Sequence, residues 1–259
     1  MVQAGRPCRV QADAFGFGSA SRPLAVVRAS IGRVSTQTLT RIDPAYTTPI
    51  YSQTEVAKII VAPKATVSNW ATGYLSASGA KQRPVLSGVV SGRGITVPFV
   101  GLAEAYVLTA FRKAGLPLQR IRPAVAALKE TIGLEYALAS ARLMTDGVEV
   151  LLKSDDPADR RLVVVRHGQA VFSEVVEDYL RFVDFGDEGM VSSIRLPRFD
   201  RQSVSVTPTI NGGQPTVTSR GVLVSSILGR LRAGESPEDV GDDFGISADE
   251  VLYLNRAES

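Results

Sequence analysis

Two short helices joined by a proline-containing turn are predicted at residues 52–73, and this pair constrains the fold of the chain more than any other feature. Ser52 precedes Glu55 with the Ser-x-x-Glu spacing of a capping box, which starts a helix by satisfying its free amide groups. The first helix is expected at residues 53–60, and its apolar face contains Val56, Ile59 and Ile60.

The second helix of the pair follows Pro63, which closes a short turn. Residues 65–73 are expected to be helical, with Val67, Trp70 and Ala71 turned toward the core. Two short helices connected in this way form a helix-turn-helix. Residues 74–97 are rich in glycine and contain the alternating Val85, Leu86, Val89 and Val90, which suits a β-hairpin in the position of a wing.

Two amphipathic helices are expected next, at residues 102–114 and 118–132. The second places its apolar residues at the spacing of one buried face, and Pro123 inside it should produce a kink. These apolar residues are Leu118, Ile121, Val125, Leu128 and Ile132.

After residue 147 the pattern changes to short strands, and the chain ends in short helices with clear start and stop signals. Ser236-Pro237 and Ser247-x-x-Glu250 predict two helix starts, whereas Gly234 and Gly245 predict helix ends. Strands are expected at residues 148–152, 162–166, 191–196, 203–207 and 214–218, helices near 173–180 and at 225–233, a turn at 211–213, and a linker at 197–202.

The predicted fold class is therefore α+β and helix-rich. A winged helix-turn-helix domain is followed by a small domain of mixed β structure and three helices. We expect four parts: a poorly ordered basic arm at 1–48, the DNA-binding domain at 49–147, a mixed connecting region at 148–202, and an acidic domain at 203–259. The arm could equally be a tail or an overlong start of the reading frame.

The net charge of +3 hides an uneven distribution along the chain. Residues 1–41 and 42–154 each carry a net charge of +5, whereas residues 155–259 carry −7. A basic region is attracted to phosphate through counterion release, whereas nucleic acid would repel the acidic region, which fits a protein partner better.

Single cysteine and histidine residues limit the chemistry that one chain can perform. Cys8 and His167 exclude disulfide frameworks, thiolate zinc sites and iron–sulfur clusters, and no cofactor is expected. No apolar stretch approaches the roughly 20 residues needed to cross a bilayer, and the start lacks the apolar run of a signal peptide, so a cytoplasmic location is expected.

One motif is similar to a catalytic site. Residues 162–174, LVVVRHGQAVFSE, resemble the strand and Arg-His-Gly loop of the histidine phosphatases, but the second histidine of those enzymes is missing. We therefore interpret Arg166-His167-Gly168 as a turn and expect no enzyme. Asp155, Asp156 and Asp159 are interpreted as a solvated turn rather than a metal site.

Two stretches resemble a known family. Residues 51–152, with YSQTEVAKIIVAPKATVSNWATGY, resemble the MerR-like winged helix-turn-helix domain of VapB-type antitoxins. Residues 203–257, with GRLRAGESPEDV, resemble the antitoxin-associated domain of unknown function that follows it in those proteins. The resemblance implies a type II antitoxin that neutralises a PIN-like ribonuclease toxin by direct binding and represses its own operon.

The second helix of the pair would read operator DNA through its outward polar residues. Asn69 can pair with adenine, and the hydroxyls of Thr66, Ser68 and Thr72 can reach phosphates or base edges, although a solvated helix face is the simpler interpretation. Basic residues of the turn and the presumed wing would contact phosphate: Lys64, Lys81, Arg83 and Arg93.

The acidic last segment would cover the basic RNA-entry surface of a toxin. The expected toxin-binding residues are Glu235, Asp239, Asp242 and Asp243, with Glu238, Asp249 and Glu250 nearby, although stabilisation of helix N-termini explains Glu238 and Asp239 equally well. A homodimer is expected because two-fold operators are read by two-fold proteins. The alternative function is a stand-alone MerR-like regulator that responds to a small molecule.

Overall fold

The computed structural model describes residues 42–76, 79–119, 121–122, 125–126, 129, 135–141, 180–201 and 203–258. Several sequence predictions lie outside these residues. They are the arm up to residue 41, the kink at Pro123, the strands at 148–152 and 162–166, the Arg-His-Gly turn, the aspartate cluster at 155–159, and the helix near 173–180 except residue 180.

The predicted helix pair is confirmed and lies within one residue of its expected bounds. Helix α2 (Gln53–Ile59) begins with the complete capping box: the Glu55 amide donates to Ser52 Oγ, and the Ser52 amide donates to Glu55 Oε2 at 2.7 Å. Helix α3 (Lys64–Thr72) follows the turn. Val61 adopts a left-handed backbone in that turn, with φ of 53°, a conformation that is costly for a β-branched residue.

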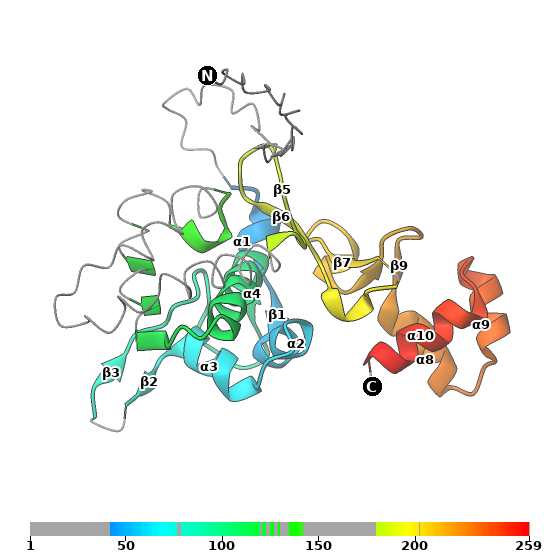
Figure 1. Ribbon diagram of the computed structural model, residues 1–259, viewed down its shortest axis with the longest axis horizontal. Helices are drawn as coiled ribbons and strands as arrows, with labels where there is room; N and C mark the ends of the chain where they lie inside the picture. The colour runs from blue at the N-terminus through cyan, green and yellow to red at the C-terminus, as the bar shows by residue number, and fades with distance from the viewer. Residues whose placement is uncertain are drawn as a thin grey trace, which may run out of the picture. The chain divides into compact units, whose positions relative to one another are not determined.

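The expected wing is shorter than predicted. Strands β2 (Tyr74–Leu75) and β3 (Lys81–Gln82) pair antiparallel and form a small hairpin directly after α3, as Figure 1 shows. Val85 and Leu86 were expected in the hairpin but are buried, and their amides donate to the Trp70 carbonyl of α3 at 2.8 and 3.2 Å. Because the Trp70 carbonyl engages both amides, these amides do not extend the ladder of the hairpin.

A second pair of strands contains one strand before the helix pair and one strand after the hairpin. Strand β4 (Ile95–Pro98) pairs antiparallel with β1 (Pro49–Ser52), which precedes the capping box. Residues assigned to the arm form the one-turn helix α1 (Pro44–Thr47), whose Asp43 accepts a hydrogen bond from the Ala45 amide. Tyr46 of α1 packs edge-on against Phe99.

Helix α4 (Phe99–Lys113) is the centre of the domain and begins three residues before its predicted start. Every residue from Phe99 to Phe111 is buried, so the helix is surrounded by protein on all sides. In the predicted helix at 118–132, the described residues 118, 119, 121, 122, 125, 126 and 129 are helical. Ile121 and Val125 of that helix are buried as expected.

A five-stranded antiparallel sheet follows in the order β5-β6-β7-β8-β9. Its first strands, β5 (Val183–Phe185) and β6 (Val191–Arg195), come from the connecting region, whereas β7 (Val204–Val206), β8 (Thr216–Val217) and β9 (Val222–Leu223) come from the last segment. Short 3-10 turns are η1 (Ala137–Ala139), η4 (Pro197–Phe199) and η5 (Asn211–Gly213). One sheet thus crosses the boundary expected at residue 202.

The predicted linker at 197–202 is packed rather than extended. Phe199 is buried, and Arg198 donates a hydrogen bond to the Lys58 carbonyl at the end of α2. Tyr51, which precedes the capping box, donates to the Gly213 carbonyl at 2.6 Å in a buried position. These contacts fasten the start and the end of α2 to residues more than a hundred positions later in the chain.

Three helices end the chain, as the start and stop signals predicted. They are α8 (Val224–Arg232), α9 (Pro237–Phe244) and α10 (Ala248–Glu258). Ser236 caps α9, Gly245 ends it in the left-handed conformation, and Ser247 caps α10 through Glu250. The fold is α+β, with the helix-turn-helix domain first and the sheet with its three helices second.

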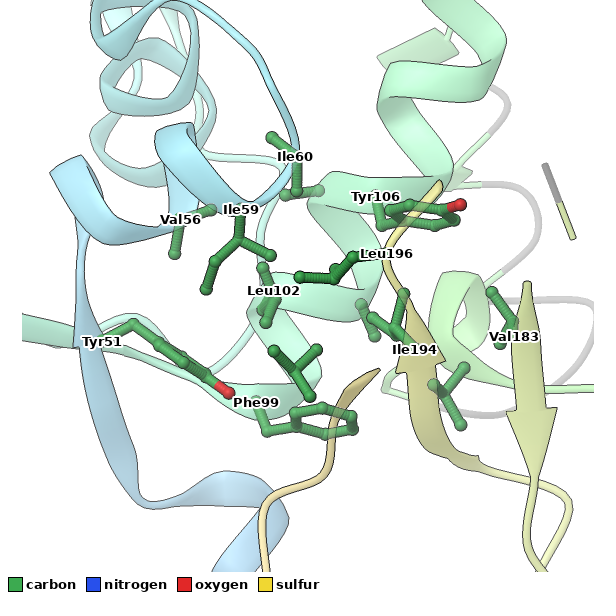
Figure 2. Close-up of a cluster of buried hydrophobic side chains, with 14 of the residues drawn as sticks. Tyr51, Val56, Ile59, Ile60, Phe99, Leu102, Tyr106, Val183, Ile194 and Leu196 are labelled. Atoms are coloured by element: carbon green, nitrogen blue, oxygen red, sulfur yellow. The ribbon is translucent and has the colours of Figure 1, made fainter. Parts of the chain in front are cut away.

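One hydrophobic core joins these elements. Figure 2 shows Val56, Ile59 and Ile60 of α2 beside Leu102 and Tyr106 of α4, with Ile194 of β6 and Leu196 closing the same cluster. Strand β6 of the sheet and Leu196 therefore share a hydrophobic core with α2 and α4. Among the described residues, no helix is long and apolar enough to span a membrane.

Candidate nucleic-acid interface and acidic surface

Helix α3 turns one face to the core and leaves the opposite face open. Val67, Trp70 and Ala71 are buried, whereas Asn69 and Thr72 are exposed on the other side. The predicted residues Thr66 and Ser68 flank this open face and are half-buried. Ala65 is also exposed there, and sequence reasoning missed it, although its place one turn before Asn69 could have revealed it.

The side-chain chemistry of the open face differs from residue to residue. Thr72 Oγ1 donates to the Ser68 carbonyl at 2.9 Å and lies 3.3 Å from the Gly73 carbonyl, so its proton is engaged by the backbone. Asn69 has an amide that can donate and accept at the same time, and the Ala65 methyl offers an apolar surface. The face can therefore offer polar and apolar contacts to base edges in a groove.

The amino end of α3 is open and basic. Pro63 occupies the N-cap position and provides no side-chain hydrogen bond, and Lys64 is the first residue of the helix. A cation at a helix N-terminus is unfavourable because the helix dipole places partial positive charge there. Free amides and a lysine at this end form an arrangement that favours a phosphate group.

The hairpin is held against α3 by its backbone. Gly73 ends α3 with φ of 77°, and a Cβ atom at this position would lie 2.2 Å from the Gln82 carbonyl oxygen, so only glycine fits. Arg122 donates to the Arg83 carbonyl, and its guanidinium lies 5.5 Å from the centre of the Tyr74 ring. Arg122 was not predicted as part of the site. It lies in the helix that follows α4 and contacts the base of the hairpin.

The predicted basic residues divide into two groups. Lys64 begins α3, Lys81 lies on β3, and Arg83 follows β3, and all three are exposed. Arg93 was expected on the wing, but it lies in the exposed loop before β4, and β4 pairs with β1 rather than with the hairpin. The structure therefore places Arg93 outside the β2–β3 hairpin.

A buried carboxylate lies below the loop that follows the hairpin. Glu104 of α4 is fully buried and accepts hydrogen bonds from the Ser87 amide at 2.5 Å and from Ser87 Oγ at 2.9 Å. Lys129 Nζ donates to the same hydroxyl at 2.8 Å. Burial raises the pKa of Glu104 to about 7, against the opposing effects of the Ser87 hydrogen bonds and Lys129.

Helices α9 and α10 repeat the helix-turn-helix register of α2 and α3. Ile246 N donates to the Gly241 carbonyl at 3.0 Å, just as Ala62 N donates to the Ala57 carbonyl at 2.9 Å. Gly245 takes the left-handed position that Val61 occupies in the first pair. The equivalent buried residues are Val240, Val251 and Leu254 in the second pair and Val56, Val67 and Trp70 in the first.

The second helix of this repeat is closed at the places where α3 is open. The amino end of α10 is capped by Ser247 and Glu250: the Ser247 amide donates to Glu250 Oε2, and the Glu250 amide donates to Ser247 Oγ. Tyr253, the equivalent of Asn69, donates to Asp200 Oδ1 at 2.6 Å and accepts from the Arg201 amide. The first turn of α10 thus carries two carboxylates, Asp249 and Glu250, whereas the first turn of α3 carries none.

The predicted acidic residues lie around α9, and two of them share one cation. Arg230 of α8 pairs with Glu235 and, at 2.6 Å, with Asp243. These hydrogen bonds raise the pKa of Arg230 and lower that of Glu235. Asp239 lies in the first turn of α9 and accepts a hydrogen bond from Oγ of the capping residue Ser236 at 2.6 Å.

Asp242 is the predicted toxin-binding residue that is most available to a partner. It is exposed and forms no ion pair within the described part of the chain. Glu238 lies on the same outer face of α9 and is exposed too. Arg230 was not predicted as part of this surface, because its pairing with Asp243 depends on how α8 packs against α9.

Two family models match two separate parts of the chain. Residues 49–125 match a family model described as "Putative DNA-binding HTH domain", and residues 204–253 match "Protein of unknown function (DUF433)". The chain is 41% identical to "Putative antitoxin VapB45" of Mycobacterium tuberculosis, over 78% of this chain and 91% of that protein. It is 26% identical to "Uncharacterized protein Rv2308" of the same organism, over 78% of this chain and 87% of that protein.

A solved structure has a similar fold. The X-ray crystal structure of Rv2018 from Mycobacterium tuberculosis matches with a TM-score of 0.65 and 34% identity, and the match covers 80% of this chain and 97% of that one. The identity to the antitoxin, the match across both domains and the open face of α3 agree with one another. The chain therefore belongs to the family of VapB-type antitoxins with an N-terminal DNA-binding helix-turn-helix domain.

Proposed function

We propose that this protein is the antitoxin of a type II toxin–antitoxin pair, which binds its operator through α3 and the β2–β3 hairpin and neutralises a PIN-like ribonuclease toxin by direct binding. The observation that carries the DNA-binding part is the contrast between the two helix pairs. The open amino end of α3 carries Lys64 and no side-chain cap, whereas α10 is capped by Ser247 and Glu250. Repression of its operon would take place in the cytoplasm, and the protein acts by binding rather than by catalysis.

In this proposal each predicted residue has a definite part. Asn69, with Ala65 beside it and Thr66, Ser68 and Thr72 around it, reads base edges, because polar and methyl groups distinguish bases in the major groove. Lys64, Lys81 and Arg83 neutralise phosphates on either side of the groove. Arg93 would reach a phosphate only from the separate loop before β4.

Removing a phosphate contact should weaken binding to every DNA sequence alike. We expect Lys64→Ala and Lys81→Ala each to reduce the slope of log affinity against log salt concentration by about 1. Fluorescence anisotropy with operator and unrelated duplexes at several salt concentrations measures both effects. Arg220→Gln, at an exposed position far along the chain from the hairpin, is the control. An unchanged slope in both lysine variants would remove these residues from the interface.

The outer face of α9 would bind the toxin through charge. Glu238, Asp239 and Asp242 project from one side of α9, and this negative surface complements the positive surface with which a ribonuclease attracts RNA. Glu235 and Asp243 contribute less free charge because Arg230 neutralises part of it. A homodimer formed through the helix at 118–132 or through the C-terminal domain would present two copies of α3 to a two-fold operator.

Charge reversal tests this surface. Asp242→Lys should lower the affinity for the toxin encoded by the neighbouring gene by roughly five- to tenfold at low salt, and by less at high salt, because exposed charges are screened. Titration calorimetry at two salt concentrations measures the change. Asp187→Lys, at another exposed acidic position, should leave the affinity unchanged. Equal effects of the two variants would exclude a specific role for α9.

A further inference from the structure

A small cavity lies between the first helix of the DNA-binding pair and the first helix of the C-terminal three. It has a volume of about 240 Å³. Helix α2 and helix α8 form two of its walls, and Arg198 of the η4 turn lies beside the end of α2. The lining residues are Glu55, Lys58, Ile59, Arg198, Gln214, Pro215, Val224, Ser225, Leu228, Arg232 and Glu258.

Arg198 is fixed in this cavity by two of its three guanidinium nitrogens. Nη1 donates to the Lys58 carbonyl at 3.0 Å, and Nη2 pairs with Glu258 Oε2 at 2.8 Å. Nε is buried and donates to no acceptor among the described residues. A buried donor on a charged group that lacks an acceptor is costly, and an oxygen from a bound molecule would satisfy it.

The cavity is lined by three cationic and two anionic side chains, which leaves one net positive charge. Glu55 accepts a hydrogen bond from the Ser52 amide and keeps its negative charge, and Glu258 is paired with Arg198. Lys58 and Arg232 are exposed and form no ion pair with any residue that the structure describes. Two available cations and one unsatisfied guanidinium N–H therefore surround the same space, and their combined field favours an anion.

The remaining walls are apolar and limit the size of a ligand. Ile59, Val224 and Leu228 are nearly or fully buried, and Pro215 completes this side. The volume corresponds to about eight water molecules at roughly 30 Å³ each, which is below the range of drug-sized ligands. A molecule with one ring or one branched chain fits this space.

We propose that the cavity between α2 and α8 binds a small carboxylate with an apolar body, whose carboxylate lies near Arg198, Lys58 and Arg232 and whose body contacts Ile59, Val224 and Leu228. Such a ligand contacts the first helix of the DNA-binding pair and the C-terminal helices together. This site goes beyond toxin and DNA binding and does not depend on either.

The test uses the full-length protein without DNA or toxin. Benzoate, phenylacetate and 3-methylbutanoate are the probes, and benzamide, phenylacetamide and 3-methylbutanamide are their neutral counterparts, with binding followed by saturation-transfer NMR. We expect at least one carboxylate to bind saturably with a dissociation constant around 1 mM, the value typical of so small a ligand, and its amide to bind at least about tenfold more weakly.

Variants at the cavity separate a specific site from general attraction of anions. Lys58→Gln with Arg232→Gln should weaken carboxylate binding by about tenfold or more, whereas Arg220→Gln, at an exposed arginine outside the cavity, should have no effect. Circular dichroism confirms that each variant is folded. Three results would each overturn the proposal. None of the three carboxylates binds saturably, a carboxylate and its amide bind equally well, or the double variant binds the carboxylate as tightly as the wild-type protein does.

Discussion

At the residue scale, the buried carboxylate of Glu104 shows how one side chain joins three segments of the DNA-binding domain. It accepts two hydrogen bonds from Ser87 in the loop after the hairpin, and Lys129 reaches the same serine from the following helix. Glu135 adds a negative charge nearby, which acts in the same direction as burial. The stability of the loop below the hairpin therefore depends on the protonation of Glu104.

Glu104 should make the stability of the protein depend on pH near neutrality. Its pKa is raised from 4.5 to about 7 by burial, so the folded state binds the proton more tightly than the unfolded state. The free energy of unfolding should be highest below about pH 4.5 with respect to this group, and should fall as the pH rises from there to about 7, by roughly 3–4 kcal/mol at about 1.4 kcal/mol per pKa unit.

Glu104→Gln should remove this dependence and leave the contributions of other groups. Urea denaturation at pH 5, 6, 7 and 8 measures the free energy of unfolding of both proteins. The value for the variant minus the value for the wild-type protein should rise from pH 5 to 7. Glu238→Gln, at an exposed acid, serves as the control. A difference that stays constant from pH 5 to 8 would show that folding does not raise the pKa of Glu104.

At the element scale, the turn η5 fastens the sheet to the strand that precedes the helix pair. Gly213 has φ of 75°, and a Cβ atom there would lie 2.3 Å from the Tyr51 hydroxyl oxygen. Gly212 also has a positive φ, of 60°, but a Cβ atom there would meet nothing within 4 Å. The two neighbouring glycines therefore differ in crowding and share a similar backbone conformation.

Alanine at the two positions should separate crowding from backbone strain. Gly212→Ala should cost about 1 kcal/mol, the strain of a left-handed alanine, whereas Gly213→Ala should cost at least about 2 kcal/mol more because it displaces Tyr51. Thermal and chemical denaturation of both variants measures the difference. Equal destabilisation would mean that Tyr51 and Gly213 are not in contact in solution.

Local signals in the sequence predicted the elements, and long-range packing limited what could be predicted beyond them. The capping boxes at Ser52 and Ser247 depend on residues three positions apart, so both helix starts were found. The Tyr51–Gly213 hydrogen bond joins residues far apart in the chain, and no local pattern indicates it. Val85 and Leu86 have the apolar pattern of a strand, but their amides donate to the Trp70 carbonyl of α3 rather than to a neighbouring strand.

The candidate site was predicted in the same uneven way. The outward face of α3 follows from helical periodicity, and Asn69 is exposed as that periodicity requires. The position of Arg93 off the hairpin could not be predicted, because it depends on the pairing of β4 with β1. The sharing of Arg230 between Glu235 and Asp243 depends on the packing of α8 against α9.

At the scale of the whole molecule, the chain contains two helix pairs in the same register with opposite surface chemistry. The first pair has an uncapped, basic amino end on its second helix, and the second pair has a capped, acidic one. We propose that only the first pair reads DNA and that the second pair lies in the part of the protein that binds a protein partner.

One DNA-binding assay compares an exposed position of α3 with an exposed position of α10. Asn69→Ala should weaken binding to the operator by about 1–3 kcal/mol, or roughly 5- to 150-fold, and should leave binding to unrelated duplexes almost unchanged. Leu252→Ala, at the α10 position equivalent to Ser68, should bind the operator as the wild-type protein does. Unchanged operator affinity in Asn69→Ala, or a loss of operator affinity in Leu252→Ala as large as in Asn69→Ala, would contradict the assignment of DNA reading to α3 alone.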